Sequence, residues 1–64
     1  MKRYITDSNG KRHAVWLDFE EGTVEFAGMV EPQPVPEDRH DYRYTHGGGL
    51  YRLACDLYWK ELSR

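Results

Sequence analysis

The chain has 64 residues, of which 39% are hydrophobic and 31% charged, and its formal net charge is −2. This length allows one domain with a modest core and excludes a second domain or a deep substrate cleft. The single cysteine, Cys55, excludes an internal disulfide. No apolar stretch approaches the roughly 20 residues that span a bilayer, so we expect a cytoplasmic protein without a membrane partner.

The first half of the chain alternates in the way that β-strands do. Residues 2–6 are rich in strand-forming types and precede Asn9-Gly10, a dipeptide typical of tight turns. In residues 13–20 the alternation places Val15, Leu17 and Phe19 on one face, with Ala14, Trp16, Asp18 and Glu20 on the other. A second turn at Gly22 leads into residues 23–30, where Val24, Phe26 and Val30 share a face and Thr23, Glu25, Ala27 and Met29 share the opposite one. We therefore predict a three-stranded antiparallel meander over residues 2–30.

The second half predicts a linker and a helix. Three prolines at alternate positions in residues 31–46 cannot continue a central strand, which favours an extended linker. In residues 47–63 apolar side chains recur at three- and four-residue spacing, which predicts a helix. The chain is thus expected to form one α+β domain over residues 1–64, with the helix packed on the sheet.

Charge is unevenly distributed along the chain. From residue 14 to residue 42 there are eight acids and one base, a net charge of −7, whereas the remaining residues carry +5. Such an acidic surface attracts a basic groove, and an apolar residue among the carboxylates can serve as an anchor. The alternative is that these carboxylates only keep a small protein soluble. The predicted partner-binding residues are Trp16, Asp18, Glu20, Glu21, Glu25, Glu31, Glu37, Asp38 and Asp41.

Other features do not indicate catalysis or a cofactor. His13, His40, His46 and Cys55 lack the paired spacing of a structural zinc site. The glycines at 47–49 lack the flanking residues of a phosphate-binding loop, and neither serine lies in a nucleophile motif. We therefore expect a non-enzymatic protein without a metal or another cofactor.

The chain resembles the small acidic inhibitors that phages and mobile elements encode, particularly anti-CRISPR proteins. The resemblance is based on its length, on the expected fold of one small sheet with one helix, and on the acidic block from Asp18 to Asp41. That group shares no motif, so no residue role is carried over. The resemblance implies an inhibitor of a nucleic-acid-guided complex in the host cytoplasm, in some members by imitation of DNA. The basic N-terminal hairpin and helix depart from a uniformly acidic mimic.

Three hypotheses follow from this pattern. The first is an inhibitory protein whose acidic face occupies the basic DNA site of a protein partner, without binding nucleic acid itself. The second is an assembly subunit that forms a homodimer, or docks on another chain, through Tyr51, Cys55 and Trp59 of the helix. The third is nucleic-acid binding by the basic residues of the first hairpin, which the nearby −7 segment disfavours; the residues involved would be Lys2, Arg3, Tyr4, Lys11 and Arg12.

Overall fold

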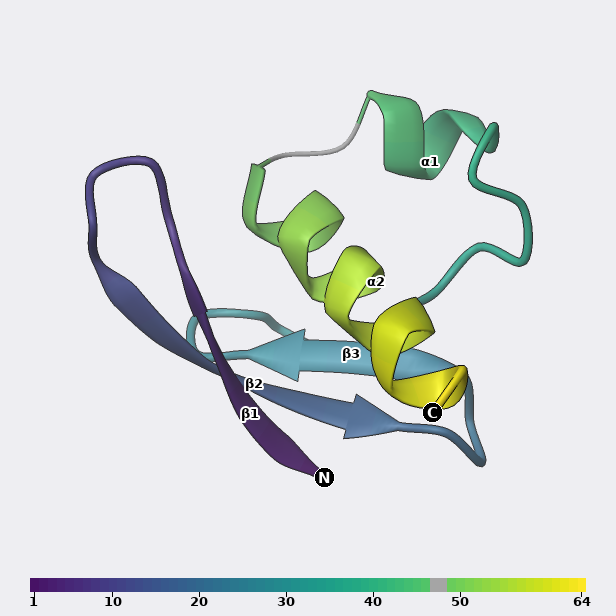
Figure 1. The fold of residues 1–64 in the computed structure, drawn as a ribbon, viewed down its shortest axis with the longest axis horizontal. Helices are drawn as coiled ribbons and strands as arrows, with labels where there is room; N and C mark the ends of the chain where they lie inside the picture. The colour runs from purple at the N-terminus through teal and green to yellow at the C-terminus, as the bar shows by residue number, and fades with distance from the viewer. Residues whose placement is uncertain (47–48) are drawn as a thin grey trace.

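A computed structural model describes residues 1–46 and 49–64 and has one sheet with two helices (Figure 1). The strands are β1 (Lys2–Thr6), β2 (Arg12–Asp18), β3 (Thr23–Phe26) and β4 (Gln33–Pro34). The helices are α1 (Tyr42–Thr45) and α2 (Gly49–Leu62). The four strands are antiparallel neighbours in the order β1-β2-β3-β4, so the predicted α+β class and meander are confirmed, with one strand more than expected.

Turn chemistry sets the register of the first hairpin. Gly10 has a φ of +81°, and one carboxylate oxygen of Asp7 accepts hydrogen bonds from the amides of Asn9 and Lys11, each at 2.9 Å. A side chain that satisfies turn amides in this way stabilises the turn locally. As a result Tyr4 faces Ala14 across the hairpin.

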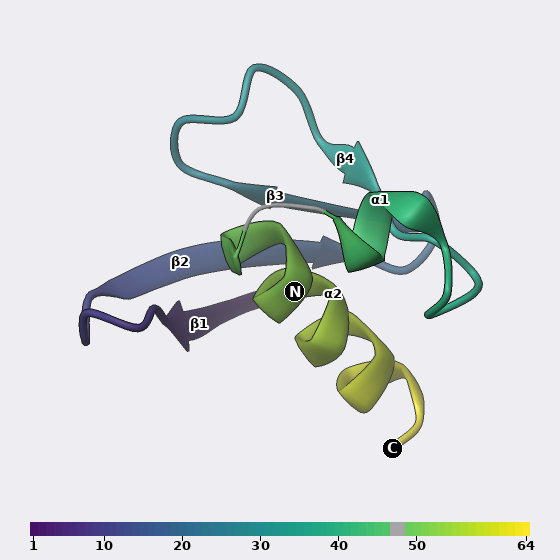
Figure 2. The ribbon, with the colours of Figure 1, turned by 90° about the horizontal axis from the view of Figure 1, so that it is seen from above.

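The helix α2 covers one face of the sheet, as the sequence predicts (Figure 2). Val15 and Val24 have no exposed surface and Leu17 is 2% exposed. These side chains, with Ile5 from β1, meet Ala54 and Tyr58 of α2 to form the core. The core therefore uses the inward positions of three strands, and the residues between them lie on the uncovered face.

The segment expected to be an extended linker is more structured than predicted. Gln33 and Pro34 form the edge strand β4, in which Pro34 faces Thr23 and Gln33 faces Val24. Next to this pair, the Val35 amide donates to the Gly22 carbonyl at 2.8 Å. Because bonded and non-bonded pairs alternate along an antiparallel ladder, Pro34 occupies a non-bonded position. An edge position of this kind tolerates proline because no partner needs its missing N–H group. The same segment contains α1, whose N-cap is Asp41.

The end of the third strand also differs from the prediction. β3 stops at Phe26, and the Met29 amide bonds back to the Phe26 carbonyl at 3.1 Å. Gly28 in this turn has a φ of +96°. Val30, expected on the core face, is consequently fully exposed.

The predicted helix extended over residues 47–63, and its first two positions lie outside the described residues. The Tyr51, Cys55 and Trp59 row, proposed as an interface, packs within the chain instead. The Tyr51 hydroxyl donates to the Pro34 carbonyl at 2.6 Å, Cys55 is buried, and Trp59 meets the ring of Tyr44 edge-on at 5.1 Å. Of this row, only Cys55 is buried, and Tyr51 and Trp59 are half-buried. No described helix is long and apolar enough to cross a membrane.

Candidate functional site

No helix or strand among the described residues packs over the sheet face opposite α2 (Figures 1 and 2). Its residues are those that alternate with the core positions, so Trp16 and Asp18 of β2 lie there beside Glu25 and Thr23 of β3. Trp16 is 42% exposed. A large aromatic side chain exposed among charged residues is typical of a binding surface.

Trp16 lies at the boundary between a cationic and an acidic half of this face. On the β1 side, the Lys2 ammonium lies 5.6 Å from the Trp16 ring centroid and 5.5 Å from that of Tyr4. The Arg12 guanidinium lies 4.1 Å from the Tyr4 centroid. On the β3 side, Glu25 faces Trp16 directly. Cations at these distances are attracted to the ring faces, so Lys2 and Arg12 are held over the aromatic rings.

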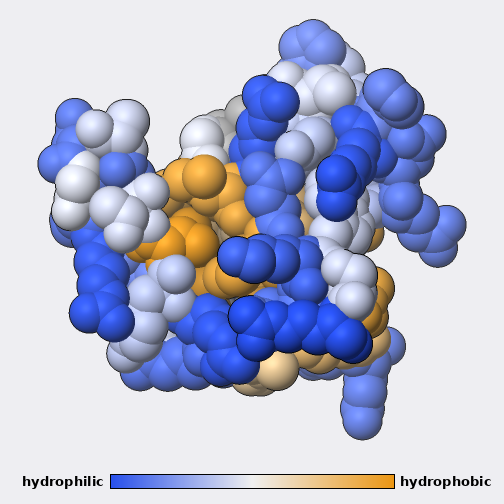
Figure 3. All heavy atoms as spheres, in the orientation of Figure 1, coloured by the Kyte–Doolittle hydropathy of each residue, from blue (hydrophilic) through white to orange (hydrophobic). Residues whose placement is uncertain are grey.

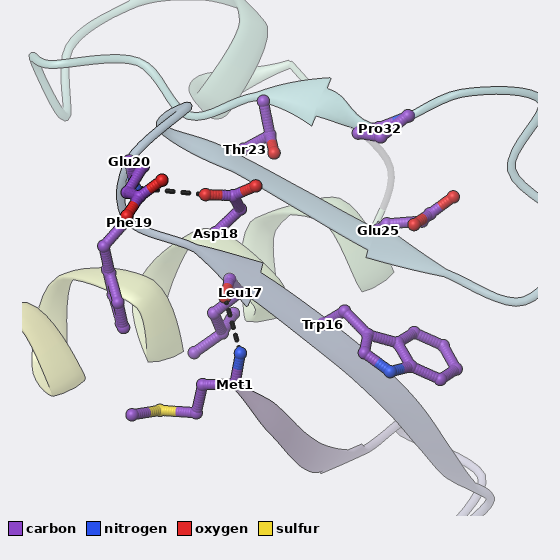
Figure 4. A pocket seen from close by; sticks show the side chains of 9 residues that line it. All are labelled: Met1, Trp16, Leu17, Asp18, Phe19, Glu20, Thr23, Glu25 and Pro32. Atoms are coloured by element: carbon purple, nitrogen blue, oxygen red, sulfur yellow. Dashed lines mark hydrogen bonds between the residues drawn. The ribbon is translucent and has the colours of Figure 1, made fainter.

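A depression with a volume of about 630 Å³ lies on the acidic side of Trp16 (Figure 4). We call it the acidic depression, because the charged side chains around it are carboxylates. It is lined by Met1, Trp16, Leu17, Asp18, Phe19, Glu20, Thr23, Glu25 and Pro32. The structure thus gathers four of the nine predicted partner-binding residues, one aromatic and three acidic, around one hollow.

Asp18 has a structural role as well as a place in this depression. One of its carboxylate oxygens accepts hydrogen bonds from the amides of Glu20, at 3.1 Å, and Glu21, at 3.0 Å. Its carbonyl accepts the Gly22 amide at 2.8 Å. The turn that presents Glu20 therefore depends on Asp18, whereas Glu20 and Glu25 make no hydrogen bond through their carboxylates within the described residues.

The remaining predicted acids do not join the depression. Glu21 and Glu37 line a different hollow, beside Tyr58 and Trp59. Glu31 is exposed in the connection that follows β3. The acidic block of the sequence is therefore divided among several surfaces.

Two more acids are engaged in backbone capping. Asp38 accepts the His40 amide at 2.8 Å, and Asp41 accepts the amide of Arg43 at 2.8 Å. The Arg43 guanidinium also donates to both carboxylate oxygens of Asp41, at 3.1 Å each. This pairing lowers the pKa of Asp41 below its ordinary value. Asp41 is thus partly neutralised by a neighbour and less suited to bind a partner.

The residues of the aromatic and cationic half, Lys2, Tyr4 and Arg12, were predicted as a separate nucleic-acid site and not as neighbours of Trp16 and the acidic residues. Alternation in β1 places Lys2 and Tyr4 on one face, and this signal was present in the sequence. What the sequence lacked was the pairing that sets Lys2 opposite Trp16. Among the described residues, no group of three His, Cys, Asp or Glu side chains is arranged to hold a metal ion.

Comparisons with protein-family models, with curated protein sequences and with solved structures each found no match.

Proposed function

We propose that this protein is a binding protein that docks a basic surface of a protein partner on the open sheet face, with the acidic depression as the contact site. The observation that carries the proposal is that Trp16, Glu20 and Glu25 line one hollow, on a sheet face that no described helix or strand covers. A half-exposed indole beside carboxylates can both anchor a side chain and attract cations.

The same geometry favours an arginine- or lysine-rich partner. Glu20 is exposed and Glu25 is half-buried, and the other side chains of the depression add no Lys or Arg. Carboxylates that are not engaged in local pairs keep their full attraction for an approaching cation, and this attraction steers association. The interaction is expected to weaken as salt concentration rises, because exposed charges are screened over about 8 Å at physiological ionic strength.

The partner surface that we propose is the DNA-binding site of a nucleic-acid-guided complex, which would make the protein an anti-CRISPR-type inhibitor. A site built to bind phosphates presents the arginines and lysines that this depression would take. Lys2 and Arg12 lie on the opposite side of Trp16, so the proposed imitation of DNA is limited to the β3 side of the face.

The test is capture of binding partners from a bacterial lysate by tagged protein at low and high salt, with identification by mass spectrometry. The wild type is compared with a double variant, Glu20→Lys with Glu25→Lys. The control is Glu21→Lys with Glu37→Lys, which changes net charge by the same amount on a different surface. The proposal predicts salt-sensitive capture of a DNA-binding protein that the first variant loses and the control keeps.

Purified target then decides the mechanism. If the protein inhibits its target in the proposed way, it competes with a DNA duplex for that target, and the Glu20 and Glu25 double variant no longer competes. Equal loss of capture in both double variants would mean that net charge alone controls binding, which would refute the assignment of the site. A captured target that still binds DNA in the complex would refute the inhibitor function alone.

A further inference from the structure

The β1 strand is an open edge of the sheet. The amide and carbonyl of Leu17 bond to Met1, at 2.7 and 3.0 Å, and the Asp7 amide bonds to the Lys11 carbonyl at 2.9 Å. Bonded pairs alternate along an antiparallel ladder, so Arg3 and Ile5 direct their backbone groups toward β2. The intervening residues of β1 direct theirs away from the sheet, where Figure 2 shows no neighbouring strand.

The opposite edge of the sheet is protected. β4 has only two residues, one of which is a proline that cannot donate. The Tyr51 hydroxyl takes up the Pro34 carbonyl at 2.6 Å. By contrast β1 has five residues without proline or glycine. Arg3 donates to the Lys2 carbonyl at 3.0 Å. No other described side chain bonds to the outer backbone groups of β1. An edge of this length is a template for another strand.

An apolar stripe of α2 lies on the same side of the molecule. Arg3 of β1 pairs with Glu61 of α2 at 3.6 Å. Leu57, Leu53 and Leu50 precede Glu61 at three- and four-residue intervals, so they lie on the same flank of α2. Leu53 is 37% exposed, and Leu50 and Leu57 are partly buried. Figure 3 shows apolar surface between the hairpin and the helix on this side. A hollow of about 490 Å³ here is lined by Leu50 and Leu53, with a polar rim from Asp7, Ser8, Arg52 and Asp56.

We infer that this edge and stripe together bind a second copy of the chain, by antiparallel pairing of β1 with β1 about a two-fold axis at Tyr4. The two Tyr4 residues then face each other and exchange both hydrogen bonds. Lys2 of each copy does the same with Thr6 of the other, and the Lys2 carbonyl, which accepts from Arg3 in its own chain, uses its second lone pair for the Thr6 amide. The axis keeps both α2 helices on one face of a continuous sheet. Their Leu53 and Leu57 side chains approach each other across the axis.

The charges of β1 fit this register. Lys2 faces the uncharged Thr6 of the second copy, and Arg3 faces Ile5, so no like charges stand directly opposite each other. Arg3 is already paired with Glu61 within its own chain. The Lys2 ammonium lies over an aromatic ring, and the paired Tyr4 rings extend that aromatic surface. The self-complementary register favours a second copy over an unrelated strand, and the inference does not rest on the proposed function.

The test is the mass of the intact 64-residue chain by light scattering over about a hundredfold range of concentration, since dimers follow mass action. The expected mass is twice 7.6 kDa. Chemical synthesis allows N-methylation of the Tyr4 amide, which removes an outward donor and no bond within the chain. This change should raise the dimer dissociation constant more than about a hundredfold, since it deletes the two central bonds and adds steric conflict. Leu53→Glu should do likewise, whereas Leu62→Glu, on the opposite flank of α2, should leave the dimer intact.

Circular dichroism establishes that each variant is folded. If the N-methylated chain does not fold, hydrogen exchange of the wild type decides instead: the Lys2, Tyr4 and Thr6 amides should be protected only at concentrations where the dimer forms. A wild-type chain that is monomeric throughout overturns the inference, as does a folded N-methylated chain that still dimerises. Protection of these amides in a monomer by an added acidic peptide would assign the edge to a different protein and would also overturn it.

Discussion

The assignment of one sheet face to the core and the other to binding predicts opposite behaviour for two adjacent residues of β2. Leu17 is 2% exposed beneath α2, whereas Trp16 is 42% exposed on the open face. Replacing Leu17 by Ala removes buried methyl groups and leaves a cavity, at a cost of about 2–5 kcal/mol. Replacing Trp16 by Ala leaves no internal cavity, and the loss of partly buried ring surface costs about 1–2 kcal/mol.

Because the domain is small, the stability losses of the two variants should have different consequences for folding. A core of this size supplies about 3–5 kcal/mol of stability. Leu17→Ala should therefore leave much of the chain unfolded at 25 °C, while Trp16→Ala should remain folded and lose its partner in the capture experiment. The assay is urea unfolding followed by far-ultraviolet circular dichroism. With a slope of about 1 kcal/mol per M, the midpoints of the two variants should differ by about 1–3 M.

The control for secondary-structure preference is Glu25→Ala, which also truncates a strand residue of the open face. It should unfold close to the wild type, because Glu25 lies on the open face and is not part of the core cluster. Comparable destabilisation by Trp16→Ala and Leu17→Ala would refute the division of the sheet into a covered and an open face. A Trp16→Ala variant that is folded and binds the partner as tightly as the wild type would instead refute the role of Trp16 in binding.

Three further predictions concern stability and reactivity. Burial raises the pKa of the Cys55 thiol to about 11, so a thiol reagent at neutral pH should modify it only after unfolding, and rapid labelling of the folded chain would contradict its burial. The hydrogen bond to His13, with help from backbone amides, lowers the pKa of Asp7 in the folded chain below 3.8. The ionised Asp7 therefore stabilises the fold fully above pH 3.8, and this contribution to stability is lost as the pH falls through the pKa of Asp7 in the folded chain. Asp7→Asn keeps an oxygen for the turn amides, so in urea titrations it should be less stable than the wild type near neutral pH and equally stable in strong acid. Tyr44→Phe removes the 2.6 Å bond to the Asp56 carboxylate that joins α1 to α2, and thermal unfolding should show a loss of about 1 kcal/mol.

Local patterns in the sequence determined the parts of the fold that depend on local chemistry. Alternation identified Val15 and Leu17 as core residues and Trp16 as a residue of the other face, because successive side chains of any strand point in opposite directions. Asn9-Gly10 and Gly22 marked turns because these positions need backbone angles that other residues adopt at a cost. The three- and four-residue spacing in the C-terminal segment was sufficient to identify a helix.

The helix surface was harder to interpret because apolar residues cover most of its circumference. Sequence alone left the Tyr51, Cys55 and Trp59 row available as an interface. In the structure Tyr51 contacts β4 and Trp59 contacts Tyr44, so both are half-buried, whereas Leu53 is exposed. Which flank of an apolar helix is covered depends on where distant segments pack, and periodicity carries no information about that.

The candidate site was predicted in the same partial way. Composition showed an excess of acids from residue 14 to residue 42, yet only Asp18, Glu20 and Glu25 gather beside Trp16. Asp41 caps a helix that the sequence did not reveal. Residue types and their local spacing determined the strands, turns and helix, since each depends on interactions along the chain. Tertiary structure decided the pairing of β4 with β3, the edge role of Pro34 and the grouping of charges, because each depends on which distant residues become neighbours.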